Sequence, residues 1–473
     1  MPDFPHGQLD HAFTRRTLMR KGGALAAATA SMSTGGSLWR LASAAAAGGV
    51  RAPDSLPDPS RPAGTVNAAL PFDHLVVVMM ENHSFDNLLG ALPISGQPRA
   101  RGLKFSAGGV ARNSNPGPAG KVISYPFTST AQGSDVSQSW NATHQQIDGG
   151  RMDGFVRSVG ATQPMGYWMP EVLPFAYSLA STFTLANRWF CSAPCQTYPN
   201  RRFLMAGTAY GDIATSSESL KDPPPPNGTI FDRLQAYGIS WRNYFTDLPQ
   251  TAIIPSIIEK YPTNLASIAQ FYLDCAAGSL PSVSFVDPEF GALSDVGETL
   301  STLPGLEALG AKLDTTGGDE EDPQDMSYGE NWAYSVLNAV LNSPAWSRTL
   351  LIYTYDEHGG YYDHVAPPNA IAPDSIPPEL GPEDVPGGYD IYGPRVPAVV
   401  VSPYSKPNAV TDVVHDHTSV LATIESKWNL PALTYRDANA KTVKDFLDIK
   451  QAAYMEPPTI TAPPPPVQAV TTP

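Results

Sequence analysis

Continuous apolar runs alternate along this chain with segments in which apolar side chains recur every three to four residues. Four runs are predicted as buried strands: 75–80, 282–286, 349–355 and 396–401. Four segments have helical periodicity: 230–237, 264–277, 329–342 and 419–428. Continuous apolar strands that alternate with helices are typical of a sheet buried on both faces. The pattern therefore predicts an α/β fold with a mostly parallel central sheet and helices on both faces.

The N-terminal segment departs from this pattern. The pair Arg15-Arg16 precedes a weakly apolar Gly/Ala/Ser run over 22–36, and a small-residue cleavage site follows at Leu41-Ala42-Ser43-Ala44. This order predicts a twin-arginine signal segment over residues 1–47. We expect the protein to be exported, to the periplasm or to the outside of the cell.

Three further segments are distinguished by composition. Residues 48–70 are rich in Pro, Asp, Arg and Ala and are predicted as a linker into one folded domain over 71–454. Residues 455–473 are rich in Pro, Thr and Ala, with four consecutive prolines at 463–466. Such a composition predicts an extended or disordered tail.

Net charge narrows the choice of partners. The 473 residues carry a formal net charge of −15. Residues 1–47 hold five basic and two acidic side chains, so removal of this +3 changes −15 to −18. An acidic body argues against nucleic acid as a partner and against strong attraction to anionic lipid, and leaves neutral or zwitterionic lipids open. The pairing of the three cysteines, Cys191, Cys195 and Cys275, is left open by their spacing.

Oxygen-bearing side chains follow two of the predicted strands. Glu81 and Asn82 come directly after 75–80, and Asp356 and Glu357 come directly after 349–355. Ligands of α/β sheets bind at the carboxyl ends of strands, and carboxylates gathered there repel one another unless a cation lies between them. These four residues therefore predict a site for one or more divalent metal ions of unknown identity. The alternative is that they are ordinary helix N-caps.

A candidate nucleophile lies in the segment Gln196-Thr197-Tyr198-Pro199-Asn200-Arg201-Arg202. Pro199 favours a rigid turn that presents the Thr197 hydroxyl at the start of a helix, where backbone N–H groups favour an anion. A metal bound to that hydroxyl would lower its pKa and make Thr197 a nucleophile and a further metal ligand. The alternative is that Thr197 only caps the helix.

Four histidines are candidates for supporting roles. His144, in a loop-like region near several glycines, could hydrogen bond a phosphoryl oxygen or protonate a leaving group. His358 directly follows the Asp356-Glu357 pair, and His364 and His417 lie further along the chain. These three could position the metal ligands, or they could be structural.

Six segments occur in an order that resembles a known family. They are Phe72 to Asp86, His144, Met152 to Phe155, Thr197 to Arg201, Tyr355 to Val365, and Arg395 to Pro397 with Ser402 to Tyr404. The chain resembles the bacterial phosphoesterase family of non-haemolytic phospholipases C and a related acid phosphatase. The resemblance covers most of residues 71–445.

The resemblance implies an alkaline-phosphatase-like three-layer fold and a covalent intermediate on Thr197. It implies metal ligation by the positions of Glu81, Asn82, Asp356 and Glu357, with the Thr197 oxygen as a further ligand. It also implies that His144 contacts phosphate. These assignments agree with those made from the strand ends.

One position departs from the family pattern. The family has a His-Pro segment ahead of the Asp-Glu strand, and the corresponding residues here are Asp322-Pro323. A carboxylate next to phosphate is repulsive unless it is protonated or metal-bound. Asp322 is therefore a candidate catalytic acid or an additional metal ligand, or the loop aligns differently.

These observations predict an exported, metal-dependent phosphodiester hydrolase of the phospholipase C type. It would cleave a phospholipid into diacylglycerol and a phosphorylated headgroup, with transient contact to a membrane surface. One alternative is an acid phosphatase that acts on phosphomonoesters. A second is a surface binding protein that has kept the fold and lost the activity.

Overall fold

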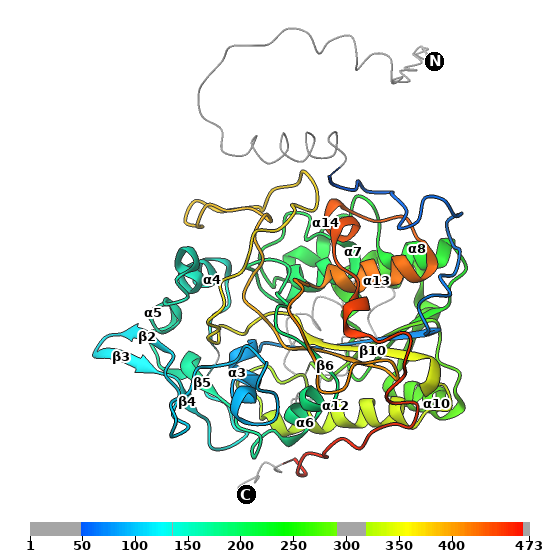
Figure 1. Ribbon diagram of the computed structural model, residues 1–473. Helices are drawn as coiled ribbons and strands as arrows, with labels where there is room; N and C mark the ends of the chain where they lie inside the picture. The colour runs from blue at the N-terminus through cyan, green and yellow to red at the C-terminus, as the bar shows by residue number, and fades with distance from the viewer. Residues whose placement is uncertain (1–48, 135, 291–317, 467–473) are drawn as a thin grey trace, which may run out of the picture.

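An eight-stranded sheet lies between two layers of helices (Figure 1). The computed structural model describes residues 49–134, 136–290 and 318–466. The predicted signal segment 1–47 lies outside these ranges and stays a prediction. From one edge to the other the strands are β12 (Val410–Thr411), β6 (Thr184–Ala186), β11 (Ala398–Val401), β10 (Thr349–Tyr355), β1 (His74–Met80), β9 (Val283–Asp287), β7 (Trp241–Phe245) and β8 (Leu265–Ser267).

The centre of the sheet is β1, which pairs in parallel with β10 on one side and with β9 on the other. Its residues from Leu75 to Met80 are completely buried, as a strand covered on both faces requires. Met80 is the register partner of Tyr355, so β1 and β10 end at the same level of the sheet. The residues that follow the two strands are therefore neighbours in space.

The predicted mostly parallel α/β sheet is confirmed, with one difference in direction. Of the seven pairings between these strands, five are parallel, while β11 runs antiparallel to both β10 and β6. An apolar run marks a buried strand but carries no information about its direction. Four strands were not predicted. β6, β8 and β12 have only two or three residues, and β7 is interrupted by the polar pair Arg242-Asn243. β8 also corrects the start of the predicted helix 264–277, which begins at residue 268.

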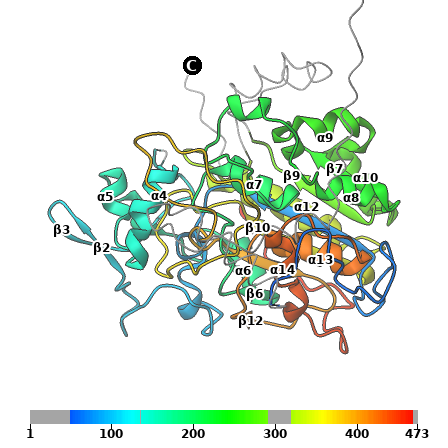
Figure 2. The same cartoon turned by 90° about the horizontal axis from the view of Figure 1, so that it is seen from above.

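Helices cover both faces of the sheet, as predicted (Figures 1 and 2). One face carries α6 (Pro174–Thr182), α10 (Ile268–Ala277) and α12 (Met326–Leu341). The other carries α7 (Thr197–Ala206), α8 (Ile230–Ala236), α13 (Thr418–Trp428) and α14 (Tyr435–Asn439). The four predicted helices correspond to α8, α10, α12 and α13.

Smaller elements surround the carboxyl ends of the strands. Between β1 and α6 they are α3 (Phe85–Leu89), β2 (Ser114–Gly117), β3 (Gly120–Ile123), β4 (Tyr125–Pro126), α4 (Trp140–Ile147), α5 (Phe155–Val159) and β5 (Gly166–Tyr167). After β7 come the short 3₁₀ helix η5 (Gln250–Ile253) and α9 (Pro255–Lys260). None of the helices in the described ranges has the length and apolarity needed to cross a membrane.

The segments on either side of the central fold lie against it. The Asp54 N–H donates to the Ala432 carbonyl at 2.9 Å, which ties the segment predicted as a linker to the body. Residues 455–466 form neither helix nor strand, yet the Ile460 side chain is 6% exposed and the Thr461 N–H donates to Ser178 Oγ at 2.9 Å. This packing differs from the disorder that the composition of the tail predicts, because one apolar side chain among the prolines reaches the core.

Candidate active site

Glu81 and Asp356 lie side by side because Met80 and Tyr355 are register partners at the ends of β1 and β10. Arg201, from α7, joins them. Its Nε donates to Asp356 Oδ2 at 3.1 Å, and its Nη2 lies 3.2 Å from Glu81 Oε1. The three side chains are all buried. A guanidinium thus bridges the first carboxylates of the two strand ends.

Asn82 adopts a left-handed backbone conformation, with φ of 65°. Its N–H donates to Asp356 Oδ1 at 3.2 Å, and its Nδ2 donates to Glu321 Oε1 at 3.0 Å. Its Oδ1 is buried and has no hydrogen-bond partner among the described residues. An unsatisfied buried acceptor is costly, so this oxygen is suited to coordinate a cation.

The backbone of Gly359 packs closely against the backbone of Asn82 and so allows its left-handed conformation. A Cβ on Gly359 would lie 1.9 Å from the Asn82 carbonyl oxygen, and its φ is +61°. We expect Gly359→Ala to lower the free energy of unfolding about 1–3 kcal/mol more than a substitution without such a clash, because the backbone of Asn82 must shift. Thermal or chemical denaturation measures the difference.

Gly109 supplies a matched control. Its φ is +75°, and an added Cβ would meet no atom within 4 Å. Gly109→Ala therefore carries only the strain of the left-handed conformation, roughly 1–2 kcal/mol. Equal losses of stability in the two variants would contradict the proposed clash with Asn82.

Two further carboxylates reach this site from the segment before α12. Carboxylate oxygens of Glu81, Asp319 and Glu321 all lie within 4.8 Å of one another. Asp319 and Glu321 face Glu81, whereas Glu320 between them accepts a hydrogen bond from the Tyr355 hydroxyl. The sequence analysis did not assign Asp319 or Glu321. The only local signal is the acidic run 319–322, and nothing in the run distinguishes these two residues from Glu320 and Asp322.

Asp322, the last residue of the acidic run, hydrogen bonds to the surrounding loops. Its Oδ2 accepts hydrogen bonds from the Tyr361 hydroxyl at 3.1 Å and from the Val136 N–H at 3.2 Å. It does not line the cavity that holds Thr197, whereas its neighbour Glu321 does. The position that departs from the family pattern is therefore occupied by a residue that holds the surrounding loops.

The charge of the site is unbalanced among the described residues. Arg201 pairs with two carboxylates, those of Glu81 and Asp356. Those of Asp319 and Glu321 lie beside Glu81, and Glu357 follows Asp356 in the chain. Burial raises the pKa of Glu81 well above its ordinary value, and the Asp356 carboxylate adds to the effect. Burial and neighbouring carboxylates likewise raise the pKa values of Asp319 and Glu357. Oxygen donors of this kind fit a hard divalent cation, which would neutralise them.

Neither strand-end pair caps a helix. The N-cap of α3 is Ser84, whose hydroxyl accepts from the Asn87 N–H at 3.1 Å. Glu357 uses Oε2 to accept from the Gly359 N–H at 2.8 Å, and no helix begins there. Its Oε1 is buried and lacks a hydrogen-bond partner within the described ranges. The N-cap alternative is therefore wrong for both pairs.

Thr197 is the first residue of α7, and the N-cap is Gln196, which makes no side-chain capping bond. The alternative that Thr197 only caps the helix is therefore wrong. Asn200 holds the preceding turn: its Oδ1 accepts from the Ala193 N–H at 3.1 Å, and its Nδ2 donates to the Cys195 carbonyl at 2.9 Å. Pro199 is tolerated in the first turn, where backbone N–H groups have no helical partner.

The three cysteines, whose pairing the spacing left open, are Cys191, Cys195 and Cys275. All three are buried free thiols.

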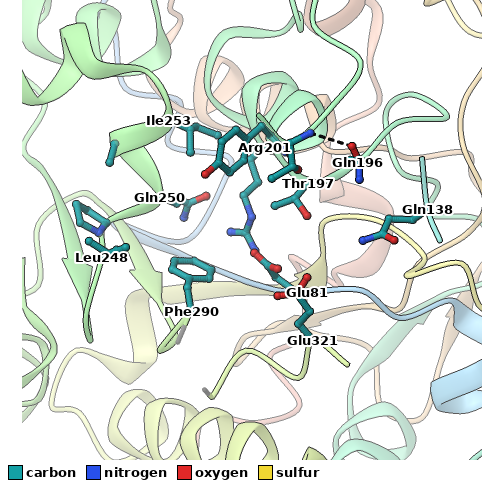
Figure 3. Close-up of a pocket in the computed structure, with 14 residues that line it drawn as sticks. Glu81, Gln138, Gln196, Thr197, Arg201, Leu248, Gln250, Ile253, Phe290 and Glu321 are labelled. Atoms are coloured by element: carbon teal, nitrogen blue, oxygen red, sulfur yellow. Dashed lines mark hydrogen bonds and ion pairs between the residues drawn. The ribbon is translucent and has the colours of Figure 1, made fainter. Parts of the chain in front are cut away.

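Thr197, Glu81 and Glu321 share one cavity of about 210 Å³. Figure 3 shows the Thr197 side chain above the carboxylates of Glu81 and Glu321, with the Arg201 guanidinium beside Glu81. The rest of the lining is Gln138, Gln196, Tyr198, Thr215, Leu248, Pro249, Gln250, Ala252, Ile253 and Phe290. The Thr197 side chain is 6% exposed, and within the described part of the chain its hydroxyl makes no hydrogen bond. The hydroxyl is thus available to a ligand in the cavity.

His417 and His358 lie directly behind the strand-end residues. His417 Nε2 donates to the Asp356 carbonyl at 2.6 Å, and its Nδ1 accepts from Trp189 Nε1 at 3.4 Å. His358 Nδ1 lies 3.1 Å from Glu357 Oε2, and its Nε2 lies 2.7 Å from Gln146 Oε1. Burial lowers the pKa of both rings, that of His358 to about 3. The neutral His417 ring therefore holds the Asp356 carbonyl, and the neutral His358 ring ties the same loop to Gln146.

His144 and His364 are not brought to the cavity. The His144 Nδ1–H donates to the Trp140 carbonyl at 2.7 Å, and its ring packs against Trp140 with centroids 4.3 Å apart. His364 Nδ1 lies 2.6 Å from Asp86 Oδ2 in a separate cluster. Gln138, just before α4, lines the cavity in the region where the sequence analysis placed His144.

The separate cluster is built around Arg395. Its Nε donates to Asp363 Oδ1 at 2.9 Å, and its Nη2 lies 3.3 Å from Asp86 Oδ1. The guanidinium also stacks over the Phe85 ring, 4.4 Å from its centroid. Asp86, Asp363 and His364 have the spacing of a metal site, but Arg395 already supplies the positive charge. This network fixes the loop after Glu81 and Asn82.

Comparisons with known proteins give a family and several relatives of this chain. The model of the Phosphoesterase family matches residues 72–431. Non-specific phospholipase C6 of Arabidopsis thaliana is 32% identical over 406 residues, which cover 80% of this chain and 72% of the plant protein. Non-hemolytic phospholipase C of Burkholderia pseudomallei is 30% identical over 390 residues, which cover 76% of this chain and 55% of that protein. A solved structure from Vibrio parahaemolyticus, of a protein in the alkaline phosphatase superfamily, aligns with a TM-score of 0.34 and 12% identity, covering 69% of this chain and 72% of that one.

Proposed function

Because the chain belongs to the Phosphoesterase family and is a phosphoric ester hydrolase, we propose that it cleaves the phosphodiester of a phospholipid in the manner of a phospholipase C. The products would be diacylglycerol and a phosphorylated headgroup. One observation carries the proposal: the Thr197 hydroxyl and the carboxylates of Glu81 and Glu321 line the same cavity. The names of the relatives support the choice of a phospholipid.

Thr197 is the proposed nucleophile. Its oxygen forms a bond to phosphorus while the bond from phosphorus to the diacylglycerol oxygen breaks. The headgroup phosphate is then held as an ester of Thr197, and water releases it in a second step. Arg201 lies next to Glu81 in the cavity, where a guanidinium can stabilise charge on the phosphoryl oxygens.

The residues that would hold divalent metal are Glu81, Asn82, Asp356, Glu357 and Thr197, to which we add Asp319 and Glu321. The unpartnered buried oxygens of Asn82 and Glu357 support this assignment. When bound, a divalent ion neutralises the carboxylates and lowers the pKa of a coordinated hydroxyl. His417 keeps the ligand loop in position through the Asp356 carbonyl, and His358 ties the same loop to Gln146.

His144 and Asp322 also have proposed roles, although neither side chain lines the cavity. His144 would contact the phosphate through Nε2, since its Nδ1–H is engaged by the Trp140 carbonyl. A movement of the ring toward the cavity is needed for that contact. Asp322 would act indirectly, through Tyr361 and the adjacent Glu321.

A panel of esters with one shared leaving group tests the function. We expect the purified protein to hydrolyse p-nitrophenyl phosphodiesters at least about tenfold faster than p-nitrophenyl phosphate, with kcat/KM as the measure. Chelation should abolish turnover and a divalent ion should restore it, because the carboxylates otherwise repel the phosphate. A preference for the monoester would instead support the acid phosphatase, and full activity after exhaustive chelation would contradict the metal site. Turnover of neither ester would support the binding protein.

A further inference from the structure

The wall of the cavity opposite the carboxylates carries a buried hydrogen-bond acceptor that no group of the described residues satisfies. Gln250, the first residue of η5, is 2% exposed and lines the cavity. Its Oε1 has no hydrogen-bond partner within residues 49–134, 136–290 and 318–466. A buried acceptor left unsatisfied costs free energy, so a ligand that donates a hydrogen bond here is favoured.

Asp287 at the end of β9 determines which end of the Gln250 amide faces the cavity. Two of the three polar hydrogens of Gln250 go to this carboxylate: the backbone N–H donates to Asp287 Oδ2 at 2.7 Å, and Nε2 donates to Oδ1. Asn243 Nδ2 holds Asp287 Oδ2 in turn, at 2.6 Å. Because Gln250 Nε2 donates to Asp287, the Oε1 at the other end of the same amide faces the cavity. Figure 3 shows the Gln250 side chain across the cavity from Thr197.

The size and lining of the cavity indicate which part of the substrate meets Gln250. A volume of about 210 Å³ lies below the range typical of pockets for larger ligands, so it suits a headgroup better than a diacylglycerol. Quaternary ammonium groups are usually bound by cages of aromatic faces. Here the Arg201 guanidinium lies over the Phe290 ring, 4.9 Å from its centroid, and occupies one of those faces. A quaternary ammonium also has no N–H to donate to Gln250.

We propose that Gln250 is a specificity-determining residue that selects phosphodiesters whose headgroup carries an N–H or O–H donor, such as ethanolamine or glycerol, over choline. The inference rests on the proposed phosphodiesterase function and assigns its headgroup class. Gln250 Oε1 accepts the hydrogen bond from the headgroup, while Phe290 and Leu248 contact its carbon atoms.

The test compares p-nitrophenyl esters of phosphoethanolamine, phosphoglycerol and phosphocholine, which share a leaving group. For the wild-type protein we expect kcat/KM for the ethanolamine and glycerol esters to exceed that for the choline ester at least about tenfold, because choline leaves Gln250 unpaired. Gln250→Met removes the acceptor at similar volume and should bring both ratios to about one.

Thr251→Val is the matched control. Thr251 lies in the same short helix and hydrogen bonds Asn243 at 2.7 Å, but it does not line the cavity. It should loosen η5 and leave the substrate ratios as in the wild type. Equal or faster turnover of the choline ester by the wild type, or equal ratios in wild type and Gln250→Met, would overturn the role of Gln250 and leave the phosphodiesterase function standing. Absence of turnover on all three esters would instead refute that function.

Discussion

Thr197→Ala is expected to lower kcat for a phosphodiester at least about a thousandfold, because it removes the nucleophile of the proposed covalent route. The hydroxyl lies in the cavity with Glu81 and Glu321, and its substitution leaves the rest of the site in place. The measurement is steady-state kcat together with acid-quenched mass spectrometry of the protein. The wild type should carry a phosphoryl-headgroup adduct on the peptide that contains Thr197, and the variant should carry none.

Folding should be affected little by this substitution. Thr197 is the first residue of α7 and makes no capping bond, so we expect a loss of about 1 kcal/mol or less in the free energy of unfolding. Thr197→Ser keeps a hydroxyl at the same place and should retain activity within about tenfold of the wild type, since the chemistry of the nucleophile is unchanged. Undiminished turnover by a folded Thr197→Ala protein would remove Thr197 from the mechanism.

Arg395→Met is expected to lower the free energy of unfolding by about 3–5 kcal/mol, because it leaves buried carboxylates without their partner. Arg395 hydrogen bonds both oxygens of Asp363 at 2.9 Å and lies 3.3 Å from Asp86. Burial raises the pKa of Asp363, and Arg395 opposes that rise. Without Arg395 the pKa in the folded state should rise further. As the pH falls, Asp363 of the variant then takes up a proton in the folded state at a higher pH than in the unfolded state. The loss of unfolding free energy caused by Arg395→Met should therefore shrink as the pH falls.

Arg348→Met provides the comparison. Arg348 pairs with Asp73 at 2.7 Å, but the two side chains are 57% and 50% exposed. An exposed pair of this kind contributes about 1 kcal/mol or less. Chemical denaturation at several pH values measures both variants. A loss for Arg395→Met no larger than that for Arg348→Met would show that the cluster around Arg395 does not stabilise the loop.

Much of the metal site could be predicted from the chain because its residues follow strands. Glu81 and Asp356 each come directly after a long apolar run, and parallel strands end at one edge of a sheet. The structure adds Asp319 and Glu321, which follow no strand directly and reach the site from an irregular segment of bends and turns before α12. No periodic pattern could have placed that segment next to β1, because its position depends on the path of the chain around the sheet.

The sequence by itself determined the class of fold, the central strands and the oxygen donors at their ends, because burial and strand register depend on local patterns of apolar residues. It also determined Thr197 as the residue at the start of a helix, because Pro199 and Asn200 act on the backbone next to it. Only the tertiary structure decided that Arg201 bridges Glu81 and Asp356, that Arg395 pairs with Asp86 and Asp363, and that Gln250 faces the cavity. The physical reason is that each of these contacts joins elements far apart in the chain, and their meeting is set by how the helices and loops pack over the sheet.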